Sequence, residues 1–279
     1  MTALSPADTT VLACANGHRF DVNRRGFASL IVGSRKLIGD SAAMLDAREA
    51  FLARGWYDGL RAALGRLVAA EAATSVIDIG CGTGYYLRGV LRTLAETQAA
   101  PTSQPDEPGL RALAVDLSSA AVARTVRAGA SLSAASTVGL VADVWSPLPI
   151  RDGAAGIVIN VFAPRNPAEF HRILNPDGFL AVVVPHPTHL QELRAAGLAL
   201  DVHGNKTADL VSSLDGLFVL ESSEDLSSVL PLTPVDVAAL IGMGPSSHHH
   251  AADAAEDHDE QRTDVTVAFR LLGFRRITA

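Results

Sequence analysis

The sequence predicts an α/β fold built on a doubly wound parallel sheet, and three observations support this. The β-branched segment Ser75–Ile79 leads into a turn rich in glycine, and a helical pattern follows from Tyr85. Further short apolar segments alternate with helical patterns along the chain, as repeated βα units require. The unbroken apolar run Phe179–Val184 is typical of a strand buried on both faces at the centre of a parallel sheet.

The glycine turn has the spacing G-x-G-x-G, with Gly80, Gly82 and Gly84. Glycine is required there because the turn needs positive φ angles and because a ligand must lie directly against the backbone. A dinucleotide-binding turn has its third glycine where this chain has Tyr85, so the sequence argues against NAD. The turn therefore indicates a different ligand, and the alternative is a glycine turn in an unrelated α/β enzyme.

Length and composition narrow the class of protein. The 279 residues suffice for one large domain and an accessory segment, with a core of aliphatic residues because aromatic residues make up only 5%. No apolar run is long enough to cross a bilayer, and the first residues lack the pattern of a secretory signal. The two cysteines, Cys14 and Cys81, suit a reducing compartment, so a cytoplasmic location is expected.

Charge is distributed unevenly along the chain. Five basic residues and one acidic residue between Cys14 and Lys36 give a local balance of +4, whereas the whole chain carries −7 and the remainder therefore −11. The negative total argues against general affinity for nucleic acid. A basic N-terminal patch on an acidic body suits a module that touches phosphate, although a solvated charged loop explains the same pattern.

The expected elements follow the order of a Rossmann-like domain. Helical patterns cover 40–53, 57–73, 85–94, 120–130 and 167–174, and Asp40 or Ser41 is expected to cap the first of them. The expected strands are 75–79, 110–116, 138–145, 155–164, 179–184, 216–222 and 264–272. The proline-rich segment 96–109 is expected to be a surface loop, and Asn175–Gly178 a turn.

Cys14 and His18 have the spacing of half a zinc site. Structural zinc is tetrahedral and needs four ligands, and no cysteine precedes Cys14 to complete the set. Bound zinc is therefore not expected. The segment 248–258 is rich in histidine and acids but lacks a regular ligand spacing, so we interpret it as exposed chain.

Acidic residues at the ends of successive strands support the interpretation of the glycine turn as part of a ligand site. Asp116 ends the second strand, where an acid accepts hydrogen bonds from ribose hydroxyls, and a helix cap is a compatible alternative role. With Asp78 before the turn, the pattern resembles the first motifs of class I S-adenosylmethionine (SAM) methyltransferases. The resemblance implies SAM as cofactor and a doubly wound sheet whose last strand is antiparallel. The residues that it places at the cofactor are Asp78, Gly80, Gly82, Thr83, Gly84, Asp116 and Asp143.

A narrower resemblance rests on the pattern C-x-x-G-H-x-F-D-x-x-R-x-G-F, which begins at Cys14, and is continued by Gly39–Ser41, Ala47–Arg48 and Gly55–Tyr57. These motifs are similar to those of the bacterial enzymes that methylate N1 of guanine in large-subunit ribosomal RNA, including the type linked to resistance to tylosin-like macrolides. The resemblance implies an RNA-recognition module over 1–38, with a degenerate zinc site, and a methyltransferase domain over 39–279.

The same resemblance implies two further cofactor contacts. In the family, the tyrosine of the G-x-Y motif contacts SAM, and so does a histidine after the fifth strand; these are Tyr57 and His189 here. From the residues alone, Tyr57 is also explained as a core aromatic at a helix start, and His189 as a surface histidine that begins a helix. The segment Met243–Ser246 resembles one that lies over the active site.

The target base is expected beyond the fourth strand, because a doubly wound sheet places its reactive chemistry at the carboxyl ends of its strands. Phe162 would stack on an extruded guanine, and Arg165 would donate to O6, where negative charge grows as N1 loses its proton. Asn160 completes the expected catalytic set. The alternative for Phe162 and Arg165 is a core aromatic beside an arginine that binds backbone.

The predicted function is transfer of a methyl group from SAM to N1 of one guanine in a hairpin of 23S rRNA. N1 carries a proton near neutral pH, so a base or a donor to O6 is needed, and the sequence identifies no base. Two rivals stay open, namely a methyltransferase that acts on a small molecule and a non-catalytic SAM-binding or RNA-binding protein. The expected partner is rRNA, no membrane association is expected, and a homodimer stays open.

Overall fold

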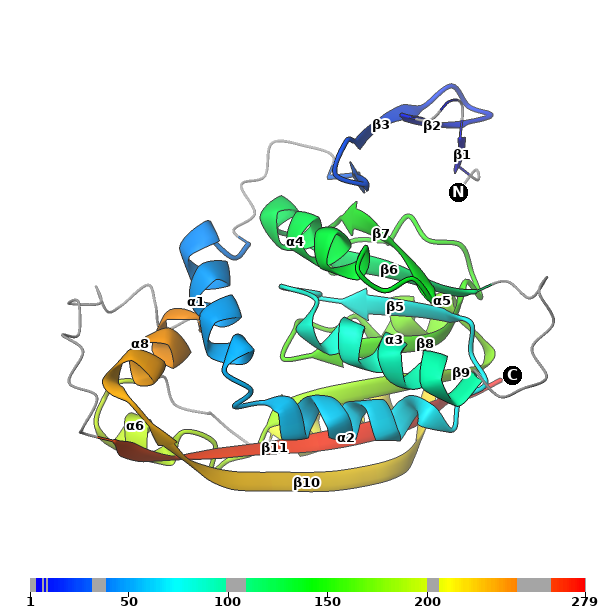
Figure 1. Ribbon diagram of the computed structural model, residues 1–279. Coiled ribbons are helices and arrows are strands. Elements are labelled where there is room, and N and C mark those ends of the chain that lie inside the picture. Colours follow the sequence, from blue (N-terminus) through cyan, green and yellow to red (C-terminus); the bar gives the residue numbers. More distant parts are fainter. Residues whose placement is uncertain are drawn as a thin grey trace.

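A mixed β-sheet forms the centre of the protein. The computed structural model describes residues 4–6, 8, 10–31, 39–98, 109–199, 206–244 and 262–278. Within these residues one eleven-stranded sheet has the order β1-β2-β3-β4-β7-β6-β5-β8-β9-β11-β10 (Figure 1). Its strands are β1 (Leu4–Pro6), β2 (Val11–Cys14), β3 (Arg19–Asn23), β4 (Phe27–Ser29), β5 (Ser75–Ile79), β6 (Leu110–Asp116), β7 (Ala135–Val141), β8 (Ala155–Val161), β9 (Leu174–Pro185), β10 (Phe218–Leu232) and β11 (Thr263–Arg276).

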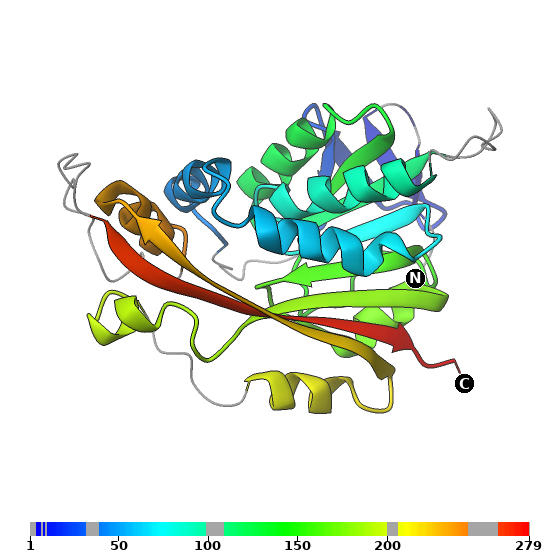
Figure 2. The same cartoon turned by 60° about the horizontal axis from the view of Figure 1, so that its bottom comes forward.

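Helices cover both faces of the sheet. The described helices are α1 (Ala42–Ala53), α2 (Asp58–Ala69), α3 (Tyr85–Gln98), α4 (Ser119–Gly129), α5 (Pro167–Ile173), α6 (Gln191–Ala195), α7 (Lys206–Leu214) and α8 (Pro234–Gly242). Helices α2, α3 and α4 pack on one face, and α5 and α7 on the other (Figure 1, Figure 2). All seven residues of β8 are buried between these layers, as its apolar sequence predicts.

The strand directions confirm the predicted doubly wound sheet. Strands β7, β6, β5, β8 and β9 pair in parallel, whereas β11 runs antiparallel to both β9 and β10. The chain winds outward from β5 through β6 to β7 and then returns to β8 on the other side. The carboxyl ends of β5, β6 and β8 therefore meet at the switch point, where such sheets bind their ligands.

Helix α3 is longer than the sequence predicts. It ends at Gln98 rather than near residue 94, so the expected loop 96–109 begins as helix. The Gln98 side chain donates from Nε2 to the carbonyl oxygen of Ala73 at 2.9 Å, which ties the last turn to the segment before β5. This long-range contact explains why local sequence gave no sign of the extension. Residues 99–108 lie outside the described part of the chain.

The expected turn Asn175–Gly178 lies within the bounds of β9. Leu174 is opposite Ala155 of β8, but the next paired residue of β9 is Phe179, which is opposite Ile157. The four residues between them have no partner in β8, so they form an irregularity in a strand and not a separate turn.

Strands β10 and β11 form a long ribbon that the sequence predicts only in part. The expected strand 216–222 is observed as Phe218–Leu232, because the polar segment after residue 222 also pairs with β11. Most of its side chains are exposed, so the alternation that indicates a half-buried strand is missing. Residues 263–268 pair with β10 alone, and this part of the ribbon extends past the parallel strands toward α8 (Figure 1).

The N-terminal strands join the edge of the main sheet. β4 pairs in parallel with β7, where Gly139 leaves the space that Phe27 fills; a Cβ at Gly139 would lie 2.7 Å from the Phe27 Cβ. Gly139 N–H donates to the carbonyl oxygen of Gly26, and Leu30 N–H to that of Val141, each at 3.1 Å. The predicted domain boundary at residue 38 stays a prediction, since 32–38 lie outside the described residues.

Helices α1 and α8 lie together beside the carboxyl edge of the parallel strands (Figure 1). Of the two expected caps, Ser41 caps α1, and Thr233 and Asp236 form a capping box for α8. Asp236 also accepts a hydrogen bond from Trp56 Nε1 at 3.1 Å and pairs with Arg54 at 3.2 Å. These bonds fix α8 to the junction between α1 and α2.

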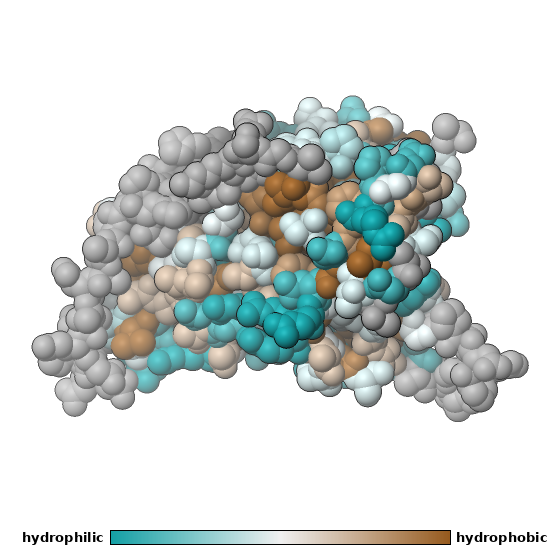
Figure 3. Space-filling model, turned by 90° about the horizontal axis from the view of Figure 1, so that it is seen from above, coloured by the Kyte–Doolittle hydropathy of each residue, from teal (hydrophilic) through white to brown (hydrophobic). Residues whose placement is uncertain are grey.

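The face above the sheet has mixed polarity. Seen from above, hydrophobic residues gather near the middle of the described surface, and hydrophilic residues border them on several sides (Figure 3). Exposed apolar side chains in the described residues include Val138 on β7 and Trp145 after β7. None of the described helices is long and apolar enough to cross a membrane.

Gly80→Ala is expected to lower the free energy of unfolding by about 2–4 kcal/mol. An added Cβ would lie 2.2 Å from the Ala163 Cβ, and the φ angle of Gly80 is +81°. Overpacking costs about 1–3 kcal/mol, and a left-handed backbone about 1 kcal/mol more. Urea titration followed by circular dichroism measures the loss.

Gly197→Ala is the matched control for this substitution, because Gly197 has a φ of +72° and its Cβ would meet nothing within 4 Å. This variant should show the backbone cost alone. Equal destabilisation of the two variants would mean that the Ala163 contact has no effect.

Candidate functional site

The glycine turn is bonded to the end of β6. The N–H groups of Gly80 and Cys81 donate to the carbonyl oxygen of Val115 at 2.8 and 3.0 Å. Gly82 N–H donates to Asp116 Oδ2 at 3.0 Å, and Thr125 of α4 donates to the Gly82 carbonyl at 3.1 Å. The turn after β5 and the acid that closes β6 are therefore fixed to each other.

Asp116 keeps spare capacity as a hydrogen-bond acceptor. Its Oδ1 accepts from Ser118 N–H at 2.9 Å, and Ser118, not Asp116, caps α4 with its own hydroxyl. Burial raises the pKa of Asp116, while the N–H donors of Ser118 and Gly82 oppose that rise. A carboxylate has about four acceptor positions, so two remain for a ligand's hydroxyl groups.

Asp78 is buried beneath the turn. Its burial, and then the nearby charge of Asp116, raise its pKa to about 8. The Asp78 carboxyl is therefore protonated at neutral pH. Asp78 and Asp116, two of the three acids that sequence analysis placed at the cofactor, thus differ in their environment.

Arg48 of α1 lies over the turn, and sequence analysis assigned it no role. A Cβ at Gly82 would lie 3.1 Å from Arg48 Nη1, so the guanidinium packs closely on the turn, and the φ of +53° at position 82 favours glycine. Arg48 pairs with Asp40 at 2.5 Å and donates to the carbonyl oxygen of Met243, at the end of α8, at 2.8 Å. The motif Ala47–Arg48 was visible in the sequence, but the position of the Arg48 side chain depends on contacts with residues far along the chain.

An aromatic cluster surrounds Phe269 of β11. The Phe269 ring centroid lies 4.9 Å from that of Tyr57, 5.4 Å from Phe162 and 4.8 Å from His189. Tyr86 of α3 lies 6.2 Å from Phe162. Sequence analysis placed Phe269 only in the last strand, because nothing local distinguishes it from a core aromatic. The structure brings together Tyr57, Phe162 and His189, which come from three separate segments.

Two buried polar atoms in the site have no hydrogen-bond partner among the described residues. Tyr57 is 3% exposed and its hydroxyl is unpaired, and burial raises its pKa. Asn160 is 0% exposed; its Nδ2 donates to the carbonyl oxygens of Ile79 and Pro164 at 3.1 and 3.0 Å, but its Oδ1 is unpaired. Buried polar groups are rarely left unpaired, so both atoms lack a partner that the described residues do not supply.

Phe162 is presented to solvent at the end of β8. It is 43% exposed, and its φ of +55° is unusual for a bulky residue. It is therefore not the core aromatic of the alternative interpretation. Such strain is typical of functional positions.

Arg165 follows on the same loop. It donates to the carbonyl oxygen of Ala163 at 3.4 Å, as the alternative interpretation expects, and forms no ion pair with a carboxylate of the described residues. Burial lowers the pKa of its guanidinium. Arg165 is thus a half-buried cation without a counter-charge beside Phe162.

His189 follows β9 and is held by β11. Its Nδ1 accepts from the N–H of Ala268 at 3.2 Å, which assigns the proton of the neutral ring to Nε2. Burial, and then the charge of Arg194, lower its pKa to about 4. His189 is therefore neutral at physiological pH and offers an N–H donor.

The remaining expected residues lie around this site. Asp143 follows β7 and accepts from Trp145 N–H at 3.0 Å and from the Ser146 hydroxyl at 3.2 Å. Thr83 is buried at the start of α3. Both lie near the carboxyl edge, where the sequence places them.

The expected half site for zinc lies in the N-terminal strands. The Cys14 sulfur is 3.3 Å from His18 Nδ1. The described residues contain no cluster of three or more histidine, cysteine or acidic side chains that could hold a metal ion. The segment 248–258 and the residues Pro245 and Ser246 lie outside the described chain.

Comparison with known proteins gives the following findings. No family model matches the chain. It is 40% identical to the 23S rRNA (guanine(748)-N(1))-methyltransferase of Streptomyces fradiae over 254 residues, which cover 90% of this chain and 84% of that protein. A Micromonospora griseorubida protein, provisionally described as a 23S rRNA (guanine-N(1)-)-methyltransferase, is 36% identical over 97% of this chain and 92% of its own length. The solved structure of the N-methyltransferase NodS from Bradyrhizobium japonicum, in complex with S-adenosyl-L-homocysteine, is 14% identical, covers 85% of this chain and 100% of that chain, and has a TM-score of 0.46.

The strand order, the glycine turn and the acids at the carboxyl edge define a class I SAM-dependent methyltransferase. Within that class, the chain belongs to the family of 23S rRNA (guanine-N1)-methyltransferases, since it is 40% and 36% identical to two relatives over most of their lengths. The resemblance found in the N-terminal motifs is thereby confirmed.

Tyr57→Phe is expected to weaken SAM binding about tenfold and to stabilise the protein in the absence of SAM. A buried hydroxyl without a partner costs about 1–3 kcal/mol, which the substitution removes, and a bound ligand would satisfy that hydroxyl. Calorimetry gives the Kd for SAM, and urea titration gives the free energy of unfolding.

Tyr85→Phe is the matched control, because the Tyr85 hydroxyl already donates to Asp58. It should lower stability and leave the Kd for SAM unchanged. If Tyr57→Phe also leaves that Kd unchanged, the Tyr57 hydroxyl does not contact the cofactor.

Asp78→Asn is expected to flatten the pH dependence of stability. The folded-state pKa of about 8 exceeds the ordinary aspartate pKa of 3.8, so the folded protein holds a proton that the unfolded chain releases. Stability contributed by Asp78 is therefore lost as pH rises from about 4 to about 8, at up to ~1.4 kcal/mol per pH unit. Free energies of unfolding at about pH 5 and about pH 7 test this.

The control for Asp78→Asn is Asp177→Asn, which removes an exposed carboxylate. It should keep the pH dependence of the natural protein. The same dependence in all three proteins would rule out a proton on Asp78.

Proposed function

We propose that this protein methylates N1 of a guanine in 23S rRNA, with SAM as methyl donor. The observation that carries this proposal is its 40% identity to the Streptomyces fradiae enzyme across most of both chains. That enzyme modifies guanine 748, so position 748 is the first place to look for the product. The geometry of the site supports the proposal in three respects.

The cofactor fits the residues at the switch point. SAM supplies a methyl group bound to a sulfonium. Asp116 has free acceptor positions for ribose hydroxyls, and Asp143 is the acid for the adenine amino group. Arg48 lies over Gly82 as a cation for the carboxylate of the amino-acid end. The unpaired Tyr57 hydroxyl supplies a further polar contact.

The target guanine would stack on Phe162. Enzymes that modify a base take it out of its helix and hold it against an aromatic or apolar surface. Phe162 is exposed, and Phe269 supports its ring from behind. Asn160 lies in the strand that ends at Phe162, and its unpaired Oδ1 can accept from an N–H of the base.

Arg165 would stabilise charge on the guanine. As N1 loses its proton, negative charge develops on O6, and a guanidinium without a counter-charge is suited to stabilise it. His189 is no candidate for the base, because its Nδ1 already accepts from Ala268 and its pKa is low. His189 instead offers its Nε2–H as a neutral donor to the cofactor.

Recognition of a hairpin by the N-terminal strands is part of the proposal. Arg19, Arg24 and Arg25 are exposed there and suit contacts with phosphate. The pairing of β4 with β7 joins these strands to the main sheet. A homodimer remains a proposal that sedimentation of the protein tests directly.

Primer extension on 23S rRNA tests the function. N1-methylguanine cannot form a Watson–Crick pair, so reverse transcriptase should stop one nucleotide short of the modified base after incubation with protein and SAM. Phe162→Ala should reduce kcat/KM about 10- to 100-fold, because base stacking contributes about 1–3 kcal/mol, while the Kd for SAM stays unchanged.

A protein that binds SAM but yields no stop on 23S rRNA would contradict the proposal. Label transfer to a metabolite extract would then identify a small-molecule methyltransferase. Absence of turnover on either substrate would identify a non-catalytic SAM-binding protein.

A further inference from the structure

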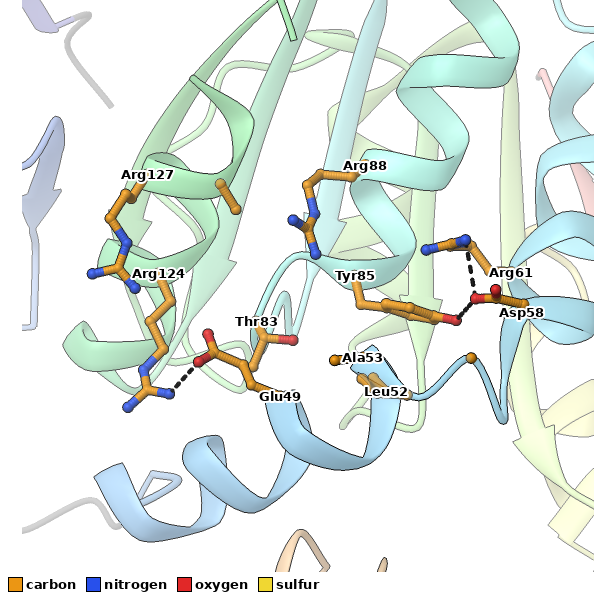
Figure 4. A pocket seen from close by; sticks show the side chains of 12 residues that line it. Glu49, Leu52, Ala53, Asp58, Arg61, Thr83, Tyr85, Arg88, Arg124 and Arg127 are labelled. Carbon is orange, nitrogen blue, oxygen red and sulfur yellow. Dashed lines mark hydrogen bonds and ion pairs between the residues drawn. The ribbon is translucent and has the colours of Figure 1, made fainter. Parts of the chain in front are cut away.

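A basic pocket lies beside the site described above and shares Thr83 with it, between α1, α2, α3 and α4 (Figure 4). Its volume is about 460 Å³. Four arginines and two acids line it together with Thr83, Tyr85 and small residues. The charged residues are Glu49, Asp58, Arg61, Arg88, Arg124 and Arg127.

Two of the four arginines are neutralised by acids. Arg61 pairs with Asp58 at 3.0 Å, and Arg124 pairs with Glu49 at 2.9 Å. Arg124 also pairs with Asp46 at 2.6 Å, outside the pocket. These pairs use both acids of the pocket lining.

Arg88 and Arg127 have no carboxylate partner among the described residues. Arg88 extends from α3 into the pocket (Figure 4), and its Nε donates to the carbonyl oxygen of Gly84 at 3.3 Å. Arg127 is exposed at the rim, on α4. The pocket therefore holds two cations that lack a counter-charge.

The surroundings of Arg88 favour an anion. Burial lowers its pKa, and the positive charges of Arg61 and Arg92 lower it further. Both effects oppose a charged guanidinium in this position. A bound anion would offset them, whereas an empty pocket leaves them in place.

The pocket adjoins the basic N-terminal strands. A Cβ at Gly26 would lie 3.0 Å from Val126 Cγ1, so the turn between β3 and β4 packs on α4 one residue from Arg127. The same turn carries Arg24 and Arg25, which are exposed. The positive residues of the N-terminal strands and of the pocket therefore lie on neighbouring elements.

The pocket is also close to the expected position of the target base. Tyr85 lines the pocket, its ring lies 5.1 Å from Tyr86, and Tyr86 lies 6.2 Å from Phe162. The pair Tyr85–Tyr86 thus separates the pocket from Phe162. Two ring contacts, of 5.1 and 6.2 Å, therefore connect the pocket to Phe162.

We propose that this pocket binds a backbone phosphate of the RNA substrate through Arg88 and Arg127. The inference rests on the proposed function, because it takes the ligand from that substrate. A guanidinium offers two parallel N–H donors to phosphate oxygens, and such bonds are short and strong. The pocket is larger than one phosphate group needs and leaves room for the adjoining ribose. Contacts of this kind position the RNA and carry no sequence information.

The test measures RNA affinity at several salt concentrations. The full-length protein is titrated with a 23S rRNA fragment that contains the modified guanine. Arg88→Gln should weaken binding about 3- to 10-fold and reduce the slope of log K against log salt by about 0.7–0.9, the value for one lost phosphate contact. The KM for RNA should rise by the same factor, and kcat and the Kd for SAM should stay unchanged.

Arg92→Gln is the matched control, since it removes the same charge from α3 outside the pocket. It should change affinity and salt slope less than Arg88→Gln does. Arg127→Gln is the second test variant. Arg127 is exposed, so its substitution should not disturb folding. Thermal unfolding verifies the fold of Arg88→Gln, Arg92→Gln and Arg127→Gln. Equal effects of Arg88→Gln and Arg92→Gln would overturn the inference.

Two further outcomes would also overturn it. A loss of SAM binding in Arg88→Gln would assign the pocket to the cofactor. Thermal stabilisation by inorganic phosphate that depends on Arg88, with unchanged RNA affinity in the variant, would assign it to a free anion. If the natural protein itself fails to bind or methylate the RNA, the proposed function fails instead, so the two failures are distinguishable.

Discussion

The hydrogen bond from Gly82 N–H to the Asp116 carboxylate is the contact on which the site depends. It joins the turn after β5 to the end of β6, and the second Asp116 oxygen joins both to the start of α4 through Ser118. The turn, the acid and the helix therefore form one rigid unit. Arg48 packs closely on this unit, since a Cβ at position 82 would lie only 3.1 Å from its Nη1.

The antiparallel last strand, β11, also borders the site. β11 reaches past the end of β9, where Phe269 is opposite Pro185, and its ring contacts Tyr57, Phe162 and His189. The projecting part of the ribbon leads to α8, which the Asp236 bonds fix to the α1–α2 junction. The Phe269 ring thus contacts residues of both the proposed cofactor side and the proposed target side of the site.

The sequence was sufficient to predict those elements and residues whose positions depend on neighbouring residues. The glycine turn, Asp116 and the buried strands follow from neighbouring residues, and all lie where they were expected. Arg48 and Phe269 could not be assigned, because their contacts come from segments far along the chain. The length of β10 was missed because most of its side chains are exposed and its middle is rich in serine and acids. The exposure of Phe162 depends on a positive φ that no sequence pattern indicates.

The pairing of β4 with β7 has a consequence for how the catalytic part of the chain can be isolated. An unpaired edge strand offers its N–H and C=O groups to other chains and promotes aggregation. By pairing with β7, β4 covers the N–H and C=O groups of that strand's edge. Phe27 fills the space left by the missing side chain of Gly139. Trimming the chain to its catalytic half would expose that edge and an apolar notch together. Removal of the N-terminal strands is therefore expected to promote association of the protein through β7.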